Sequence, residues 1–319
     1  MATAIKPGWS KPSTILFAAE IPANEKAFGF ALAQAVQHSA ILIIFHAYES
    51  GDPVLSAASG SRPSDYIQAR LEKQLLEPLA QRAAHSGIRC NVVVRQGSPA
   101  DQILSYVRER KIDRVVMGAH SPGPIGKLLV GSVAEAVLRS ANVPVCIVGP
   151  YAAEGTWRNP ASRRILCDVS KPEASQVMAN FCADLAASVK ASLLLQQVIP
   201  PQESAELLGD RTLGQIEAEL PLLVQSKLPD SIPVDARVVL GDLTEELLYQ
   251  AKARAANLIV LGAQGASSFA AVSRAGTLYK VLAYAHCPVM TLSPVLLAEC
   301  GATQLIPRPH EVNYMAGVI

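Results

Sequence analysis

The chain has 319 residues, half of them hydrophobic, and a formal net charge of +1 at pH 7. This length corresponds to about two domains, and the near-neutral charge argues against a protein that binds nucleic acid or an anionic membrane surface. The six cysteines show no metal-ligand spacing, the N-terminus lacks a signal-peptide core, and no apolar run approaches the ~20 residues that span a bilayer. We therefore expect a cytoplasmic protein.

The first half of the chain predicts short strands that alternate with helices. The strands are apolar runs of strand length, and Asn24 and Ser98 precede helical stretches as capping residues. Pro78 should kink or split one long helix. The predicted strands are 14–19, 41–47, 88–95, 113–118 and 144–148.

The second half repeats this order after a linker at 151–162, where glycine, asparagine and proline break the pattern. Asp242 caps a helix there, with Glu245 at the capping-box position. Its predicted strands are 164–168, 192–198, 232–240, 257–262 and 288–292. We predict a loose arm at 1–11, domains at 11–150 and 163–295, and a tail at 296–319.

An internal repeat supports this division. A shift of 144 residues places Gly97 on Gly241 and aligns 96–119 with 240–263 without a gap. The run Val-Val-Met-Gly-Ala at 115–119 then falls on Ile-Val-Leu-Gly-Ala. A period this long indicates a duplicated domain rather than a solenoid unit. Strands alternating with helices predict an α/β fold with a parallel sheet and right-handed crossovers.

A glycine-rich segment at 117–133 leaves a strand and enters a helix at Gly131-Ser132. Glycines allow close backbone approach, a helix N-terminus attracts anions, and Lys127 adds a cation, so the segment reads as a phosphate cradle. The alternative is that the glycines only make the turn and start the helix. The segment is not a Walker loop, because Leu128 follows Lys127 where serine or threonine is required.

Several runs resemble universal stress protein domains. They are Arg-Val-Val-Met-Gly-Ala-His from 114, Leu-Leu-Val-Gly-Ser-Val from 128 and Val-Pro-Val-Cys-Ile-Val from 143, with Arg-Ile-Leu-Cys-Asp from 164 and Cys-Pro-Val-Met-Thr-Leu from 287 in the second half. The resemblance covers most of 11–295. It implies two repeated domains of the adenine nucleotide alpha hydrolase-like fold, each a five-stranded parallel sheet of order 3-2-1-4-5 flanked by helices. Because the fifth strand commonly pairs with another domain, the chain would form its own pseudo-dimer. Whether two chains associate further stays open.

The nucleotide-binding branch of that family carries a glycine, two residues, a glycine, nine residues, and a glycine followed by serine or threonine. In the first copy Gly118, Gly131 and Ser132 match, while Ser121 replaces the second glycine. The resemblance also assigns an acidic residue after strand one and an adenine-side residue on strand two. The implied residues of this copy are Glu20, Ala47, Gly118, Gly123, Gly126, Lys127, Gly131, Ser132 and Val133.

The second copy departs from the pattern in another way. Its third glycine depends on the alignment, because the shift of 144 selects Ala275-Gly276 and a ten-residue spacer selects Gly276-Thr277. No lysine lies in this loop, and Arg274 is its cation. The implied residues are Asp168, Val198, Gly262, Gly265, Gly276 and Thr277.

The resemblance implies a non-enzymatic stress-response or signalling module that binds ATP or AMP, with Mg²⁺, where the strand order reverses beyond strands one and four. Two alternatives stay open: a degenerate scaffold that acts only by dimerising, and a slow ATP hydrolase. A hydrolase needs a metal clamp and a positioned water, and we identify no acidic pair, metal motif or partnered histidine for that role. We predict no enzyme, and we favour nucleotide binding in the first copy because of Gly131-Ser132 and Lys127.

Overall fold

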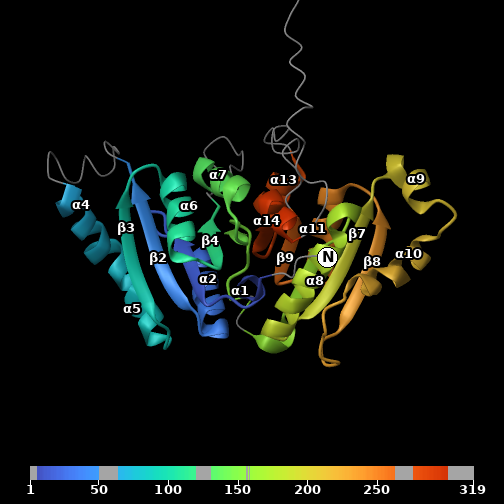
Figure 1. The fold of residues 1–319 in the computed structure, drawn as a ribbon, viewed down its shortest axis with the longest axis horizontal. Helices are drawn as coiled ribbons and strands as arrows, with labels where there is room; N and C mark the ends of the chain where they lie inside the picture. Colours follow the sequence, from blue (N-terminus) through green and yellow to red (C-terminus); the bar gives the residue numbers. More distant parts are fainter. Residues whose placement is uncertain are drawn as a thin grey trace, which may run out of the picture.

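Ten strands form one continuous sheet in the computed structural model, which describes residues 6–49, 64–119, 131–155, 157, 159–262 and 276–300. The sheet order is β3-β2-β1-β4-β5-β10-β9-β6-β7-β8, so each half has the predicted order 3-2-1-4-5 (Figure 1). The predicted strands all form, with bounds that differ by at most two residues. They are β1 (Thr14–Ala18), β2 (Ile41–Tyr48), β3 (Cys90–Gln96), β4 (Arg114–Gly118), β5 (Val145–Val148), β6 (Arg164–Asp168), β7 (Ser192–Ile199), β8 (Val234–Leu240), β9 (Leu258–Gly262) and β10 (Val289–Leu292).

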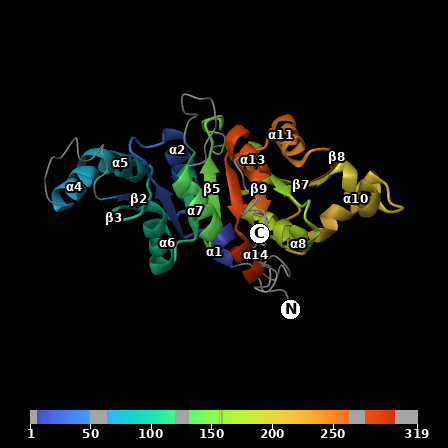
Figure 2. The same ribbon diagram turned by 90° about the horizontal axis from the view of Figure 1, so that it is seen from above.

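The two halves join through their fifth strands. Within each half the neighbouring strands are parallel, but β5 and β10 pair antiparallel, with Cys146 opposite Met290. Figure 2 shows the green β5 beside the orange-red strand of the second half, in the middle of the molecule. The edge pairing expected between two domains is therefore made within this chain.

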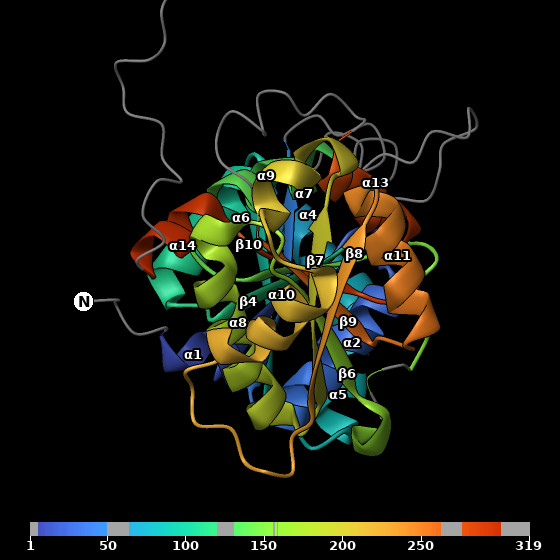
Figure 3. The same cartoon turned by 90° about the vertical axis from the view of Figure 1, so that its right-hand side faces the viewer.

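Helices surround the sheet when the molecule is viewed from its end (Figure 3). One hydrophobic core lies under α2, α5, α8 and α14, and the other lies under α6, α7, α11 and α13. The helices of the first half are α1 (Pro7–Ser10), α2 (Glu25–His38), α4 (Ser64–Arg70), η1 (Leu71–Leu76), α5 (Glu77–His85), α6 (Pro99–Arg110) and α7 (Ser132–Ser140). Those that follow are η2 (Pro160–Ser162), α8 (Pro172–Val189), η3 (Pro201–Glu203), α9 (Ser204–Leu208), α10 (Leu213–Glu219), η4 (Leu220–Leu223), α11 (Leu243–Ala253), α13 (Thr277–Tyr284) and α14 (Pro294–Glu299).

Most of the expected helix boundaries have a local cause. Asn24 accepts a hydrogen bond from the Ala27 N–H (3.1 Å), and Asp242 caps α11 through the Thr244 and Glu245 N–H groups. Ser98 precedes α6, but its side chain makes no capping hydrogen bond, so that part of the prediction is wrong. The stretch before Pro78 is the π-helical η1, as expected where proline removes a helical N–H donor.

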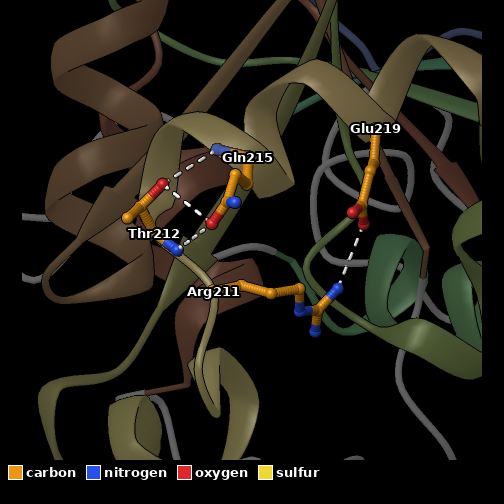
Figure 4. A network of polar contacts seen from close by, with 4 residues as sticks. All are labelled: Arg211, Thr212, Gln215 and Glu219. Carbon is orange, nitrogen blue, oxygen red and sulfur yellow. Dashed lines mark hydrogen bonds and ion pairs between the residues drawn. The ribbon is translucent and has the colours of Figure 1, made fainter.

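A capping box starts α10, the helix that precedes β8 in the second half of the chain. Thr212 and Gln215 exchange hydrogen bonds as a capping box, and Arg211 pairs with Glu219 at 3.0 Å (Figure 4). Such a box satisfies two backbone donors at the helix start. α10 packs on β8, where Glu217 accepts a hydrogen bond from the Val238 N–H at 2.9 Å.

The N-terminal segment was expected to be loose, and the described part of it is packed instead. Trp9 is 3% exposed, and its carbonyl oxygen accepts a hydrogen bond from the buried guanidinium of Arg114 at 2.8 Å. The Ser10 carbonyl accepts from Ser188 of α8 at 2.9 Å. The segment therefore ties the first half to the second, because a buried tryptophan and two carbonyl acceptors link it to both.

The predicted tail at 296–319 begins inside α14. Leu296 and Leu297 of this helix are buried in the core under α8, and residues 301–319 lie outside the described part of the chain. Among the described residues, no helix combines the length and apolarity needed to cross a bilayer.

Candidate functional site

The sheet register defines which residues are equivalent in the two domains. Ala18 pairs with Phe45, and Asp168 pairs with Gln196, each at the carboxyl end of the first strand of its domain. Asp168 therefore corresponds to Ala18, and the predicted acidic residue of the first domain, Glu20, lies two positions further along the chain. Counting onward along the second strand, Val198 corresponds to Ala47, as the sequence predicted.

Ala47 has a backbone N–H that faces the space beyond the end of β1. The Ile41 N–H donates toward β1, to the Ser13 oxygen, and the Leu42 N–H donates to the other side, to the Arg89 oxygen. This alternation directs the Ala47 N–H toward β1, which has already ended at Ala18. No described residue accepts a hydrogen bond from it.

The next acceptor along β1 is engaged by another group. The Ala19 carbonyl oxygen lies 2.8 Å from Nδ1 of His46, so this nitrogen carries the proton. Because side chains alternate along a strand, His46 lies on the α2 side of the sheet, whereas Ala47 packs on the side of α6 and α7. The imidazole thus holds the end of β1 without filling the Ala47 side.

In the second domain the equivalent N–H, that of Val198, already makes a hydrogen bond. The Val198 N–H donates to Oγ of Ser170 at 2.9 Å, and the same hydroxyl donates to Asp168 Oδ1 at 2.5 Å. The Ser170 N–H adds a bond to that oxygen at 3.0 Å. Asp168 is 8% exposed, and burial raises its pKa, while the Ser170 bonds and the Lys171 charge act in the opposite direction. Ser170, which the sequence did not single out, therefore joins two of the predicted residues of this domain, Asp168 and Val198.

The two domains also differ two residues earlier on the same strands, β2 and β7. In the first, the Phe45 ring packs against Tyr106 with a centroid separation of 5.1 Å. In the second, Gln196 occupies the same position, is fully buried, and neither atom of its amide has a hydrogen-bond partner among the described residues. A buried amide without partners costs about 1–3 kcal/mol. A pair of glutamines inside the apolar run 193–199 is the sequence signal that could have drawn attention to this position.

The glycines at the ends of β4 and β9 have different surroundings. A Cβ on Gly118 would lie 2.5 Å from Nδ2 and 2.8 Å from Cβ of Asn24. Glycine is therefore needed there for the capping residue of α2, and not only for a ligand. A Cβ on Gly262 would make ordinary contacts of 3.4 Å with Met178 and Leu297.

Each domain offers a helix N-terminus capped by glycine. Gly131 (φ −58°, ψ 152°) precedes α7, and Gly276 (φ −68°, ψ 153°) precedes α13. The starts of the two helices coincide in the alignment with the ten-residue spacer, Gly276-Thr277 on Gly131-Ser132, whereas their C-caps, Ala141 and Ala285, keep the shift of 144 because α13 is one residue shorter. Neither glycine supplies a side-chain cap, so first-turn N–H groups are available to an anion at both helices. Ser132 is exposed, and Thr277 and Val133 are half-buried.

The remaining predicted residues, Gly123, Gly126, Lys127 and Gly265, lie outside the described part of the chain, as does His120. Within the described ranges, no group of three or more histidine, cysteine, aspartate or glutamate side chains could hold a metal ion.

Comparisons with known proteins agree with this duplicated architecture. The model of the universal stress protein family matches residues 12–149 and again 161–293. A universal stress protein of Thermus aquaticus is 33% identical over 130 residues, which cover 39% of this chain and 88% of that protein. One from Mycolicibacterium smegmatis is 26% identical over 215 residues, covering 65% of this chain and 70% of that protein. The crystal structure of a universal stress protein from Archaeoglobus fulgidus superposes with a TM-score of 0.68 at 17% identity, covering 89% of this chain and 97% of that one.

Proposed function

The chain belongs to the universal stress protein family, and from this premise we propose that it is a non-enzymatic cytoplasmic stress-response module whose first domain binds ATP or AMP. The observation that supports the first domain is the open Ala47 N–H beside its closed counterpart, Val198. Ring nitrogens of adenine accept hydrogen bonds, so an open N–H at the end of the second strand can hold the base. The second domain, whose donor is engaged by Ser170, serves as the structural partner.

The phosphates belong at the N-terminus of α7 in this proposal. Its first-turn N–H groups have no side-chain cap, and the exposed Ser132 hydroxyl stands beside them. Backbone donors and the helix dipole favour a phosphate there. Lys127 adds a positive charge a few residues before the helix, and Mg²⁺ would accompany ATP as its usual counterion.

We propose binding without turnover. Phosphoryl transfer needs a group that positions or deprotonates the attacking oxygen. His46 is the described imidazole at this end of the sheet, and it lies on the α2 side of the sheet, opposite the Ala47 side on which we propose that the base binds.

Calorimetric titration of the nucleotide-stripped chain with ATP and AMP tests the proposal. Gly131→Asp places a carboxylate at the phosphate position while remaining a good helix cap, and Gly276→Asp is the matched control in the second domain. We expect saturable binding that is lost in the first variant and kept in the second. Absence of binding by the folded wild type at about 1 mM nucleotide, or loss of binding only in Gly276→Asp, would contradict the proposal.

A further inference from the structure

Gly29 stands in the middle of α2 without a packing reason. Glycine is the poorest helix former after proline, and inside a helix it usually marks a close approach of backbone. A Cβ built on Gly29 meets no atom within 4 Å. The space outside this part of α2 is therefore open, and glycine keeps it open.

The open space belongs to a groove along the outer face of α2. Gly29, Ala33 and Trp157 line two adjoining hollows of about 120 and 460 Å³. The larger has the size of a small-molecule site. We call this feature the α2 groove, lined by Gly29, Leu32, Ala33, Val36, Trp157 and Arg163.

The outer face of α2 is apolar although a core already covers the inner one. The outward positions 29, 32, 33 and 36 carry glycine, leucine, alanine and valine, and Val36 is 47% exposed. A helix normally shows polar residues opposite its buried stripe. Trp157 of the linker also lines the groove, with its ring edge-to-face against Phe30 at a centroid separation of 5.8 Å.

A buried cation faces this apolar surface. Arg163 is 6% exposed and donates to three neutral acceptors: the Trp157 carbonyl (3.0 Å), the Gln37 amide oxygen (2.6 Å) and the Val189 carbonyl (2.9 Å). Its Nη2 makes no hydrogen bond with any residue that the structure describes. No carboxylate of the described ranges forms an ion pair with it, although buried charges are normally paired.

The field around Arg163 is positive as well. Burial lowers the pKa of Arg163 itself. The pKa of His38, which lies on α2, is lowered to about 3 by burial and by the charges of Arg114, Arg163 and Lys11. The charge of Arg163 is therefore strong enough to act on its neighbour His38, and no described carboxylate pairs with it.

We propose that the α2 groove binds a small organic anion with a planar apolar body, such as an aromatic carboxylate, with its charge on Arg163 and its ring over Gly29 and Ala33. Trp157 and Arg163 come from the predicted linker and the start of the predicted second domain, so the groove is built from both parts of the chain. It shares no residue with the proposed nucleotide site and goes beyond that function.

Calorimetric titration of the full chain with 2-naphthoate, and with the neutral 2-naphthamide, tests the charge requirement. We expect one naphthoate site with a Kd of about 1 mM or tighter. The amide should bind at least about tenfold more weakly, because it lacks the charge-assisted bond to Arg163. Failure of the folded wild type to bind naphthoate, or equal affinity for both probes, would overturn the proposal.

Two substitutions of Gly29 test whether naphthoate binds in the α2 groove. Gly29→Leu fills the groove, so naphthoate affinity should fall at least about tenfold, with a melting temperature no lower than that of the wild type because leucine is the better helix former. Gly29→Ala is the matched control, and its affinity should stay within roughly twofold of the wild type. Unchanged affinity in Gly29→Leu would contradict the assignment.

Two further measurements distinguish the α2 groove from the nucleotide site and from an interface between two chains. Gly131→Asp should bind naphthoate as the wild type does, whether or not it binds ATP; parallel loss of both ligands would overturn the separate site. Sedimentation should show the same mass for wild type and Gly29→Leu. Self-association of the wild type that disappears in Gly29→Leu would make a second copy of this chain the occupant and overturn the proposal.

Discussion

The two domains have the same strand order and the same register, yet the equivalent backbone N–H groups at the ends of their second strands are bonded differently. In the first domain the Ala47 N–H points past the end of β1 and has no acceptor among the described residues, whereas in the second domain Ser170 accepts from the equivalent N–H of Val198 and donates to Asp168. The two domains thus share their strand order and register, while a single serine hydroxyl is enough to occupy the backbone N–H of one of them.

The largest expected difference between the domains lies at the glycines that end β4 and β9. Gly118→Ala should lower the free energy of unfolding by about 2–4 kcal/mol, because the new Cβ collides with Asn24 and disturbs its cap of α2. Gly262→Ala should change it by less than about 1 kcal/mol, since its contacts are ordinary. Urea unfolding of both variants measures the two losses of unfolding free energy. Equal losses would show that the contact with Asn24 is not the reason for the glycine at position 118.

Removing the hydroxyl that closes the second crevice should also destabilise the chain. Ser170→Ala leaves the Val198 N–H and one bond of the buried Asp168 unsatisfied, and we expect a loss of about 1–3 kcal/mol. The same unfolding experiment tests it, with Ser175→Ala, whose exposed hydroxyl donates to the Pro172 carbonyl of its own helix, as the control. A loss no greater than that of the control would mean that the closure of Val198 is not energetically significant.

Gln196 should respond in the opposite direction. Gln196→Leu replaces a buried amide without described partners by an apolar side chain of similar size, as the first domain does with Phe45. We expect the variant to gain up to about 1–3 kcal/mol of unfolding free energy. Thermal melting checks the sign, and a clear loss of stability would reveal that the amide makes hydrogen bonds after all.

The smallest effect concerns the pH dependence of stability. Because the pKa of Asp168 is raised in the folded state above its ordinary value of 3.8, the folded chain holds this proton over a higher pH range than the unfolded chain. Stability should therefore fall as pH rises from about 3.8 through the raised pKa. Asp168→Asn, which keeps an oxygen acceptor for Ser170, should lose this component. Parallel stability curves for the variant and the wild type across that window would contradict a raised pKa.

Apolar periodicity and the repeat of about one domain predicted the duplication and the ten strands, whereas the order of the strands followed from the resemblance to universal stress protein domains. They did not predict which residue meets which at the strand ends. Glu20 and Asp168 were predicted as the acidic residues of the two domains, but the register makes them non-equivalent, because Asp168 corresponds to Ala18 and Ser170 corresponds to Glu20. Trp9 was assigned to a loose arm because a short segment carries no periodic signal, and its burial depends on Arg114 and Ser188, which are far away in the chain.

The most direct test of the asymmetry between the domains follows the two equivalent amides themselves. In ¹⁵N–¹H correlation spectra of the deuterated chain titrated with ATP, we expect the Ala47 amide to shift and saturate while the Val198 amide stays in place. A shift of Val198 with Ala47 unmoved, or no movement of either amide, would contradict the claim that the first domain is the one that binds nucleotide.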